Sequence, residues 1–181
     1  MKRKTSILVS CVITFWMVFS VPFILAEEKP PSWKVYFSPN GECTDAIIRE
    51  LSKAQNTVLV QAYSFTSAQI AKALLDAHRR GIKVEVILDK SQRTQSYSSA
   101  TFLLNVGIPT RIDAQHSIAH NKVMIIDGET VITGSFNFTK AAEKKNAENL
   151  LIIHDKTLAS LYAKNWKEHA DHSEVYIAQG R

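Results

Sequence analysis

The feature that most constrains this chain is a short hairpin signal near residue 127. The pair Asp127-Gly128 lies between two apolar, β-branched runs, Val123–Ile126 and Thr130–Thr133. An Asp-Gly pair flanked in this way predicts two antiparallel strands joined by a tight turn. A hairpin folded about residues 127–129 places residues 134–136 opposite residues 120–122, so the pattern also predicts which side chains meet at its open end.

Four polar side chains are expected to meet at that open end. His120 and Lys122 point the same way because side chains alternate along a strand, and Ser135 and Asn137 obey the same rule on the returning strand. Cleavage of a phosphodiester needs a nucleophile, a proton donor for the leaving oxygen and positive charge on the non-bridging oxygens. We therefore predict that His120 attacks phosphorus while Lys122, Ser135 and Asn137 hold the phosphate. A plain turn is the alternative interpretation of Ser135 and Asn137.

The same residues resemble a known family. The spacing H-x-K-x-x-x-x-D (His120, Lys122, Asp127), followed by G-S-x-N (residues 134–137), resembles the phospholipase D superfamily. With its short length and single motif, the chain is most similar to the small secreted bacterial endonucleases of that superfamily. The resemblance continues upstream in Y-S-F-T (residues 63–66) and R-G-I-K-V-E-V-I-L-D (residues 80–89), so it covers most of residues 33–170. It implies the same phosphate-handling roles for the motif residues.

The resemblance also assigns two acidic residues to the catalytic set. Glu148 matches the acid that supports the nucleophile in this family, and a carboxylate is the usual partner of such an imidazole. A surface acid without a catalytic role is the alternative for Glu148. Asp127 belongs to the family signature, but its place in the turn, far from His120, predicts a structural role.

A single motif predicts half of an active site. One histidine is poorly placed to be both nucleophile and leaving-group acid, because in-line displacement puts those groups on opposite sides of phosphorus. His154-x-Lys156 repeats the first two motif positions, but Leu161 stands where the aspartate belongs. We therefore expect a homodimer in which one His120 attacks and the other protonates the departing oxygen.

The N-terminus has the layout of a secretory signal peptide. Residues 2–4 are basic, Ile7–Val21 is almost wholly apolar, and the small residue Ala26 precedes two glutamates. Cleavage after Ala26 predicts a periplasmic or secreted bacterial protein, and an uncleaved membrane anchor over Ile7–Leu25 is the alternative. Cleavage would remove three basic residues and lower the net charge from +5 to +2, so the basic composition is partly a targeting signal.

The remaining chain is expected to form one domain over residues 33–181, after a short exposed lead-in at residues 27–32. Strand and helix patterns alternate along it, which predicts an α/β fold with a mixed sheet flanked by helices on both faces, the phospholipase D-like sandwich. The expected strands are Trp33–Phe37, Thr57–Tyr63, Lys83–Leu88, Pro109–Ile112, the two hairpin strands and Ala147–Ile153. The expected helices are Thr44–Ala54, one that starts at a Thr66-x-x-Gln69 capping box and ends at Gly81, Ser98–Val106, and one from Asp155 to about His169.

No metal or cofactor is expected from the sequence. His116 lies four residues before His120, but residues 113–120 read as a loop in which no Cys or acid cluster completes a ligand set. His169 and His172 are expected to be exposed near the C-terminus. Cys43 is expected to be buried, because a free cysteine packs as a small apolar side chain.

These features predict a metal-independent hydrolase that cuts DNA, and RNA as a second substrate, through a phosphohistidine intermediate. Nothing in the sequence resembles a module that recognises bases, so cleavage is expected to be nonspecific in sequence. The alternative is a phospholipase D-type enzyme acting on lipid headgroups, although no amphipathic aromatic stretch for a bilayer follows the signal. No stable membrane association is expected after cleavage. A noncatalytic nucleic-acid-binding protein is the third interpretation, and the intact motif argues against it.

Overall fold

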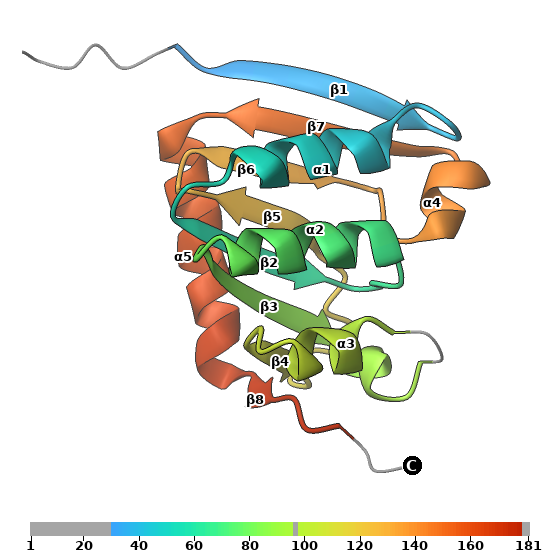
Figure 1. The fold of residues 1–181 in the computed structure, drawn as a ribbon, viewed down its shortest axis with the longest axis vertical. Coiled ribbons are helices and arrows are strands. Elements are labelled where there is room, and N and C mark those ends of the chain that lie inside the picture. Colours follow the sequence, from blue (N-terminus) through green and yellow to red (C-terminus); the bar gives the residue numbers. More distant parts are fainter. Residues whose placement is uncertain (1–29, 96–97, 179–181) are drawn as a thin grey trace, which may run out of the picture.

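The computed structural model describes residues 30–95 and 98–178 as an eight-stranded sheet between helices, with strand order β1-β7-β6-β5-β2-β3-β4-β8 (Figure 1). The strands are β1 (Ser32–Ser38), β2 (Thr57–Ala62), β3 (Lys83–Asp89), β4 (Thr110–Asp113), β5 (Lys122–Ile126), β6 (Thr130–Gly134), β7 (Glu148–His154) and β8 (Glu174–Val175). The helices are α1 (Cys43–Lys53), α2 (Ala68–Arg79), the 3₁₀ helix η1 (Lys90–Arg93), α3 (Ala100–Asn105), α4 (Lys140–Lys144) and α5 (Lys156–His172).

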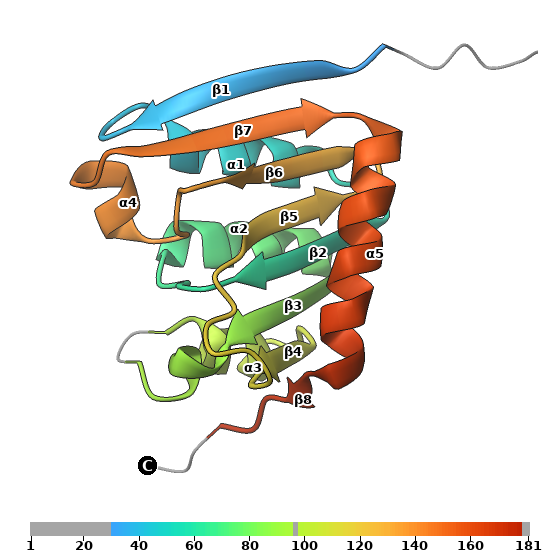
Figure 2. The same cartoon turned by 180° about the vertical axis from the view of Figure 1, so that it is seen from behind.

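The predicted mixed sheet with helices on both faces is confirmed. β2 runs parallel to β3, and β3 parallel to β4, while the other neighbours are antiparallel. α1, α2 and α3 cover one face, and α5 crosses the other (Figures 1 and 2). The larger apolar core lies under α1–α3, and a smaller one lies under α5. The indole Nε1 of Trp166 donates to the backbone oxygen of Val60 at 2.9 Å, which fixes α5 to the middle of the sheet.

The Asp-Gly hairpin is confirmed in turn type and in register. Asp127 and Gly128 both have positive φ, 55° and 66°, which is the requirement of a type I′ turn. Met124 pairs with Ile132 and Ile126 pairs with Thr130, the register expected from folding about residues 127–129. The two strands therefore place the motif residues at their open end.

Helix starts were only partly predictable. The Asp155 side chain accepts from the backbone N–H of Leu158 and caps α5, as expected. The predicted capping box at Thr66 is wrong by one residue, because Ser67 is the cap and accepts from Ile70 N–H. Thr66 instead donates its backbone N–H to Phe138, which keeps it in the extended segment after β2. Three short elements, η1, α4 and β8, were not predicted, since so few residues carry no periodic pattern.

Two expectations concern the chain termini and the cysteine. The predicted signal peptide and its cleavage point lie outside the described residues. Within residues 30–95 and 98–178, every helix is too short or too polar to cross a bilayer. Cys43 is fully buried, as predicted, and burial raises the pKa of its thiol to about 11.

Candidate active site

The site forms where β2 ends beside the start of β5. Ala62 pairs with Lys122, and Tyr63 donates its backbone N–H to Asn121 at 2.8 Å. This pairing brings the ring of Tyr63 to 4.6 Å from the His120 ring, measured between centroids. The imidazole of His120 is exposed while its neighbours along β5 are buried. The nucleophile predicted from the motif is therefore accessible and rests against an aromatic ring.

Lys122 lies two residues after His120, and it is only 6% exposed. Its Nζ donates to the backbone oxygen of His120 at 2.7 Å and lies 5.0 Å from the centroid of the Tyr63 ring. Burial lowers the pKa of Lys122, and the negative charge of Glu148 acts in the opposite direction. A partly desolvated ammonium interacts with an anion more strongly than one in water, so the arrangement suits phosphate binding.

Ser135 is positioned by the strand beside it. Its Oγ accepts hydrogen bonds from the backbone N–H and the side-chain Nδ2 of Asn149, at 3.1 and 3.3 Å. The hydroxyl proton of Ser135 is thus left to donate outward. Gly134 makes this approach possible, because a Cβ there would lie 2.3 Å from the backbone oxygen of Asn149 and its φ is +141°. The glycine of the G-S-x-N pattern is a packing requirement.

Asn137 lies on the segment that returns to β2. Phe138 forms a bridge with Phe65, and both rings are fully buried and meet edge to face. Phe136 is fully buried as well. The Oδ1 of Asn137 is buried and has no hydrogen-bond partner within residues 30–95 and 98–178. This oxygen can only accept hydrogen bonds, so a contact of Asn137 with a phosphate oxygen would come from its Nδ2 group.

Glu148 lies near Lys122 rather than in contact with the imidazole. Its Oε1 accepts from Asn146 Nδ2 at 3.1 Å, and its charge favours the protonated form of Lys122. Among the hydrogen bonds of the described residues, none joins Glu148 to the His120 ring. The role of Glu148 as the partner of the imidazole therefore stays a prediction.

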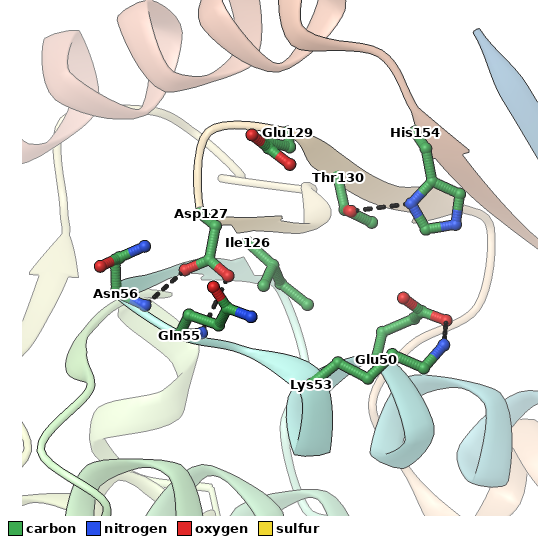
Figure 3. A pocket seen from close by; sticks show the side chains of 9 residues that line it. All are labelled: Glu50, Lys53, Gln55, Asn56, Ile126, Asp127, Glu129, Thr130 and His154. Carbon is green, nitrogen blue, oxygen red and sulfur yellow. Dashed lines mark hydrogen bonds and ion pairs between the residues drawn. The ribbon is translucent and has the colours of Figure 1, made fainter. Parts of the chain in front are cut away.

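Asp127 is at the opposite end of β5, about 17 Å along the strand from Lys122. Its carboxylate accepts the backbone N–H groups of Gln55, Asn56 and Thr57 at 2.9, 2.7 and 2.9 Å. A hollow of about 280 Å³ lies beside it (Figure 3). Asp127 therefore ties the hairpin turn to the segment that leads into β2, in line with the structural role expected from its place in the turn, and its place in the catalytic set rests on the family resemblance alone.

We expect Asp127→Asn to lower stability rather than chemistry. Asparagine tolerates the positive φ, but its amide cannot accept all three backbone N–H groups. The expected loss in the free energy of unfolding is about 1–3 kcal/mol, measured by urea denaturation. Glu129→Gln is the matched control, since its ion pair with Lys156 is exposed. A drop in turnover of folded protein without a loss of stability would restore a chemical role to Asp127.

The prediction that no ligand set surrounds His116 is wrong. Asp113, His116, His169 and His172 place their ligand atoms within 4.8 Å of one another. The rings of His169 and His172 are also only 13% and 28% exposed, so their predicted exposure is corrected. The sequence did contain a signal for this cluster, namely the two i, i+3 spacings Asp113–His116 and His169–His172. The second pair lies at the end of a predicted helix, which was expected to end near His169.

Comparison with known proteins gives the same picture of the chain. The family described as "Cardiolipin synthase, PLD-like domain" matches residues 47–170. A phospholipase D of Rickettsia typhi is 46% identical over 130 residues, which are 72% of this chain and 64% of that protein. The chain thus spans less than two thirds of that relative. A mitochondrial cardiolipin hydrolase of Xenopus laevis is 33% identical over 160 residues, 84% of this chain and 76% of that protein.

A solved structure agrees over nearly its whole length. Nuc, a phospholipase D family member from Salmonella typhimurium, superposes with a TM-score of 0.77 and 39% identity, covering 81% of this chain and 98% of Nuc. NucT from Helicobacter pylori shares the fold, with a TM-score of 0.73 at 24% identity. The family match, the shared fold and the site built on His120 and Lys122 lead to one conclusion: this chain belongs to the phospholipase D superfamily.

Proposed function

We propose that this protein is a phosphodiesterase, namely a sequence-nonspecific endonuclease that hydrolyses DNA, with RNA as a second substrate. The observation that carries the proposal is the exposed His120 imidazole beside the buried Lys122 ammonium and the outward Ser135 hydroxyl. We propose that it acts in the periplasm or outside the cell, because residues 1–26 have the layout of a signal peptide.

The proposed reaction has two steps and needs two histidines. His120 of one subunit attacks phosphorus, and a phosphorus–nitrogen bond forms as the phosphorus–oxygen bond to the leaving strand breaks. His120 of the partner subunit gives its proton to the departing oxygen. That imidazole then takes a proton from water, which attacks phosphorus and releases the first His120. Lys122, Ser135 and Asn137 hold the non-bridging oxygens throughout.

An exposed apolar face supports the homodimer. Trp33, Val35 and Phe37 alternate along β1 and are 67%, 41% and 63% exposed. α5 packs against β2, β4, β5 and β6, and β1 forms the edge of the sheet (Figure 2). Phe37 pairs with Asn149, whose amide holds the Ser135 hydroxyl, so this apolar face of β1 leads to the site. A second copy placed there covers the apolar side chains and brings the second His120 to the site.

Two observations separate the candidate substrates. Three exposed lysines, Lys140, Lys144 and Lys145, lie on the segment between Asn137 and Glu148, and such a group suits a polyanion. The relatives named phospholipase D and cardiolipin hydrolase favour the alternative, a lipid headgroup phosphodiester. The apolar face of β1 would then rest on a bilayer. β1 is thus an aromatic stretch after the signal, which was not expected from the sequence.

The deciding experiment offers both substrates to the same preparation. Supercoiled plasmid and vesicles of phosphatidylcholine with cardiolipin are incubated separately with purified protein in excess EDTA, and nicked DNA and phosphatidic acid, which hydrolysis of either lipid leaves in the bilayer, are measured. The proposal expects nicking without formation of phosphatidic acid. Phosphatidic acid without nicking would replace it with the lipid reaction.

The buried position of Lys122 predicts the alkaline limit of activity. The charged ammonium binds phosphate, so kcat/KM falls as pH rises through the pKa of Lys122 in the free enzyme. Because burial lowers that pKa, the fall is expected below 10.5, the ordinary value. Glu148→Gln removes the charge that favours the ammonium and should move the fall to still lower pH, whereas Lys122→Arg should remove it. An alkaline limb that neither variant moves would show that another group titrates.

A further inference from the structure

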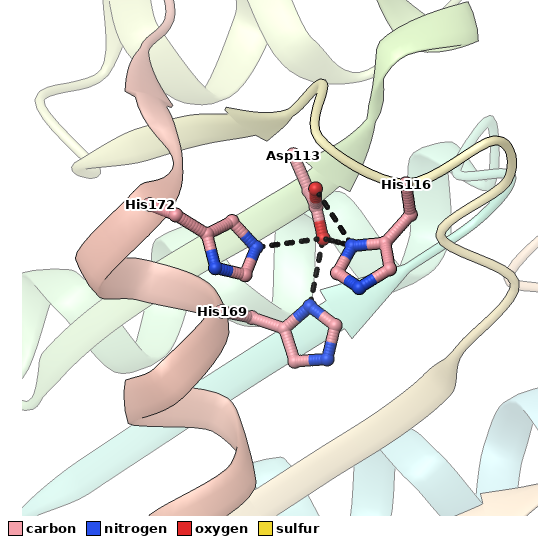
Figure 4. Close-up of side chains that lie close together, drawn as sticks. All are labelled: Asp113, His116, His169 and His172. Carbon is pink, nitrogen blue, oxygen red and sulfur yellow. Dashed lines mark hydrogen bonds and ion pairs between the residues drawn. The ribbon is translucent and has the colours of Figure 1, made fainter.

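A second cluster of polar side chains lies apart from the motif residues, at the end of β4 (Figure 4). Asp113 is the last residue of β4 and is fully buried. His116 comes from the loop that follows, and His169 and His172 come from the last turn of α5. Segments more than fifty residues apart in sequence thus meet around one carboxylate.

The three imidazoles converge on one atom, Oδ2 of Asp113. The nearest ring nitrogens of His116, His169 and His172 lie 3.0, 2.7 and 3.4 Å from it. A tetrahedral ion with arms of about 2.0–2.1 Å holds its ligand atoms about 3.3 Å from each other. These three separations are close to three of the six edges of such a tetrahedron, and all four ligand atoms lie within 4.8 Å of one another, so side-chain adjustments would admit an ion between the four groups.

The burial and the hydrogen bonds of the cluster also fit a bound cation. The carboxylate of Asp113 is fully buried, and its Oδ2 shares hydrogen bonds with the ring Nδ1 atoms of His116 and His169 at 3.0 and 2.7 Å. Nε2 of His172 is buried and forms no hydrogen bond to any group of the described residues, because its approach to Asp113 is poorly aligned. A buried carboxyl group and an unpartnered imidazole nitrogen facing each other are what a metal ion would satisfy.

We propose that Asp113, His116, His169 and His172 form a binding site for a divalent transition-metal ion of the Zn²⁺ type. Imidazole and carboxylate ligands suit zinc, and four protein ligands close the coordination sphere, which is typical of a structural site and not of a catalytic one. The His120 reaction therefore needs no metal from this site.

The position of the site gives the ion a structural task. His116 lies on the loop that leads from β4 to His120, and this loop is already held by two other contacts. Asp89 accepts the backbone N–H of Ala119 at 2.7 Å, and Lys90 donates to the backbone oxygen of His116 at 3.0 Å. A metal ion adds a tie between this loop and the end of α5. Metal binding therefore stabilises the segment that presents the nucleophile.

The test measures metal directly. Purified protein is stripped with EDTA, dialysed and titrated with Zn²⁺ or Co²⁺, and bound metal, Co²⁺ visible absorption and the thermal unfolding midpoint are recorded. We expect one ion per chain, the intense absorption of four-coordinate Co²⁺ and a raised midpoint. His169→Gln and His172→Gln should each weaken binding by at least about 10–100-fold, as losing even an outer partner of a ligand does. His78→Gln, in the last turn of α2, is the matched control and should bind as the unaltered protein does.

Several outcomes would overturn the proposal. Absence of bound metal would mean that hydrogen bonds with the histidines alone hold the Asp113 carboxyl group, and equal binding by all variants would place the ion elsewhere. Should His169→Gln fail to fold, His116→Gln carries the same test, because that ring is 45% exposed. His120→Asn should keep its full metal content, so loss of the nuclease reaction and loss of the metal site are separately visible.

Discussion

Replacing His120 with asparagine is expected to abolish plasmid nicking, with a loss of at least about 10⁴-fold in turnover. The substitution removes both the nucleophile and, in the dimer, the leaving-group acid. It should leave the site otherwise intact, because Lys122 is held by the backbone oxygen of residue 120 and not by the ring. The variant should also fail to accumulate the acid-labile phosphoenzyme that the unaltered protein forms with a slowly hydrolysed diester.

His154→Asn is the matched control for this prediction. His154 begins the partial repeat of the motif, but it lies at the end of β7, where its Nδ1 meets Thr130 Oγ1 at 2.9 Å beside the Asp127 hollow. Nicking by His154→Asn should therefore be unchanged apart from a small loss of stability. Both proteins are assayed in excess EDTA at a temperature well below unfolding. Nicking by His120→Asn at the normal rate would end the covalent mechanism.

The open end of the hairpin could be predicted because its signals are local. Asp127-Gly128 selects a type I′ turn, and strand alternation then places His120, Lys122 and Ser135 without knowledge of the rest of the sheet. The alternation of strand and helix patterns along the sequence likewise predicted the α/β sandwich fold. The prediction that Asp127 has a structural role follows from the same geometry, because a residue in the turn cannot reach the open end of the hairpin.

What the sequence did not reveal depends on contacts between distant segments. The histidine cluster forms only because α5 crosses the sheet and ends beside β4, and no local sequence pattern predicts that crossing. The helix cap is Ser67 and not Thr66, and the backbone N–H groups of both residues donate to Phe138, which is far away in sequence. The burial of Lys122, which lowers its pKa, likewise depends on a distant segment, since Tyr63, directly after β2, lies against its ammonium group.

Trp33→Glu is expected to separate the proposed dimer and with it to remove nicking. Trp33 is 67% exposed and pairs with Ile153, at the end of β1 away from the Ser38–Glu148 pair beside the site, so the change should not alter the catalytic groups. Loss of a central aromatic residue costs about 2 kcal/mol or more at an interface. A two-fold axis applies this cost twice, so the dissociation constant should rise by about 10³-fold.

Lys34→Glu separates an interface effect from an effect of charge. Lys34 is the next residue on β1, is exposed, and points to the opposite face of the strand. This control changes the net charge more than Trp33→Glu does, yet it should remain dimeric by sedimentation and active. If Trp33→Glu proves monomeric but nicks plasmid at the unaltered rate, one chain is sufficient, and the proton for the leaving oxygen must come from its own residues. If Trp33→Glu instead remains dimeric, the apolar face of β1 is not the dimer interface. If that dimeric variant also binds vesicles less well than the unaltered protein, the apolar face of β1 is a lipid-contacting surface.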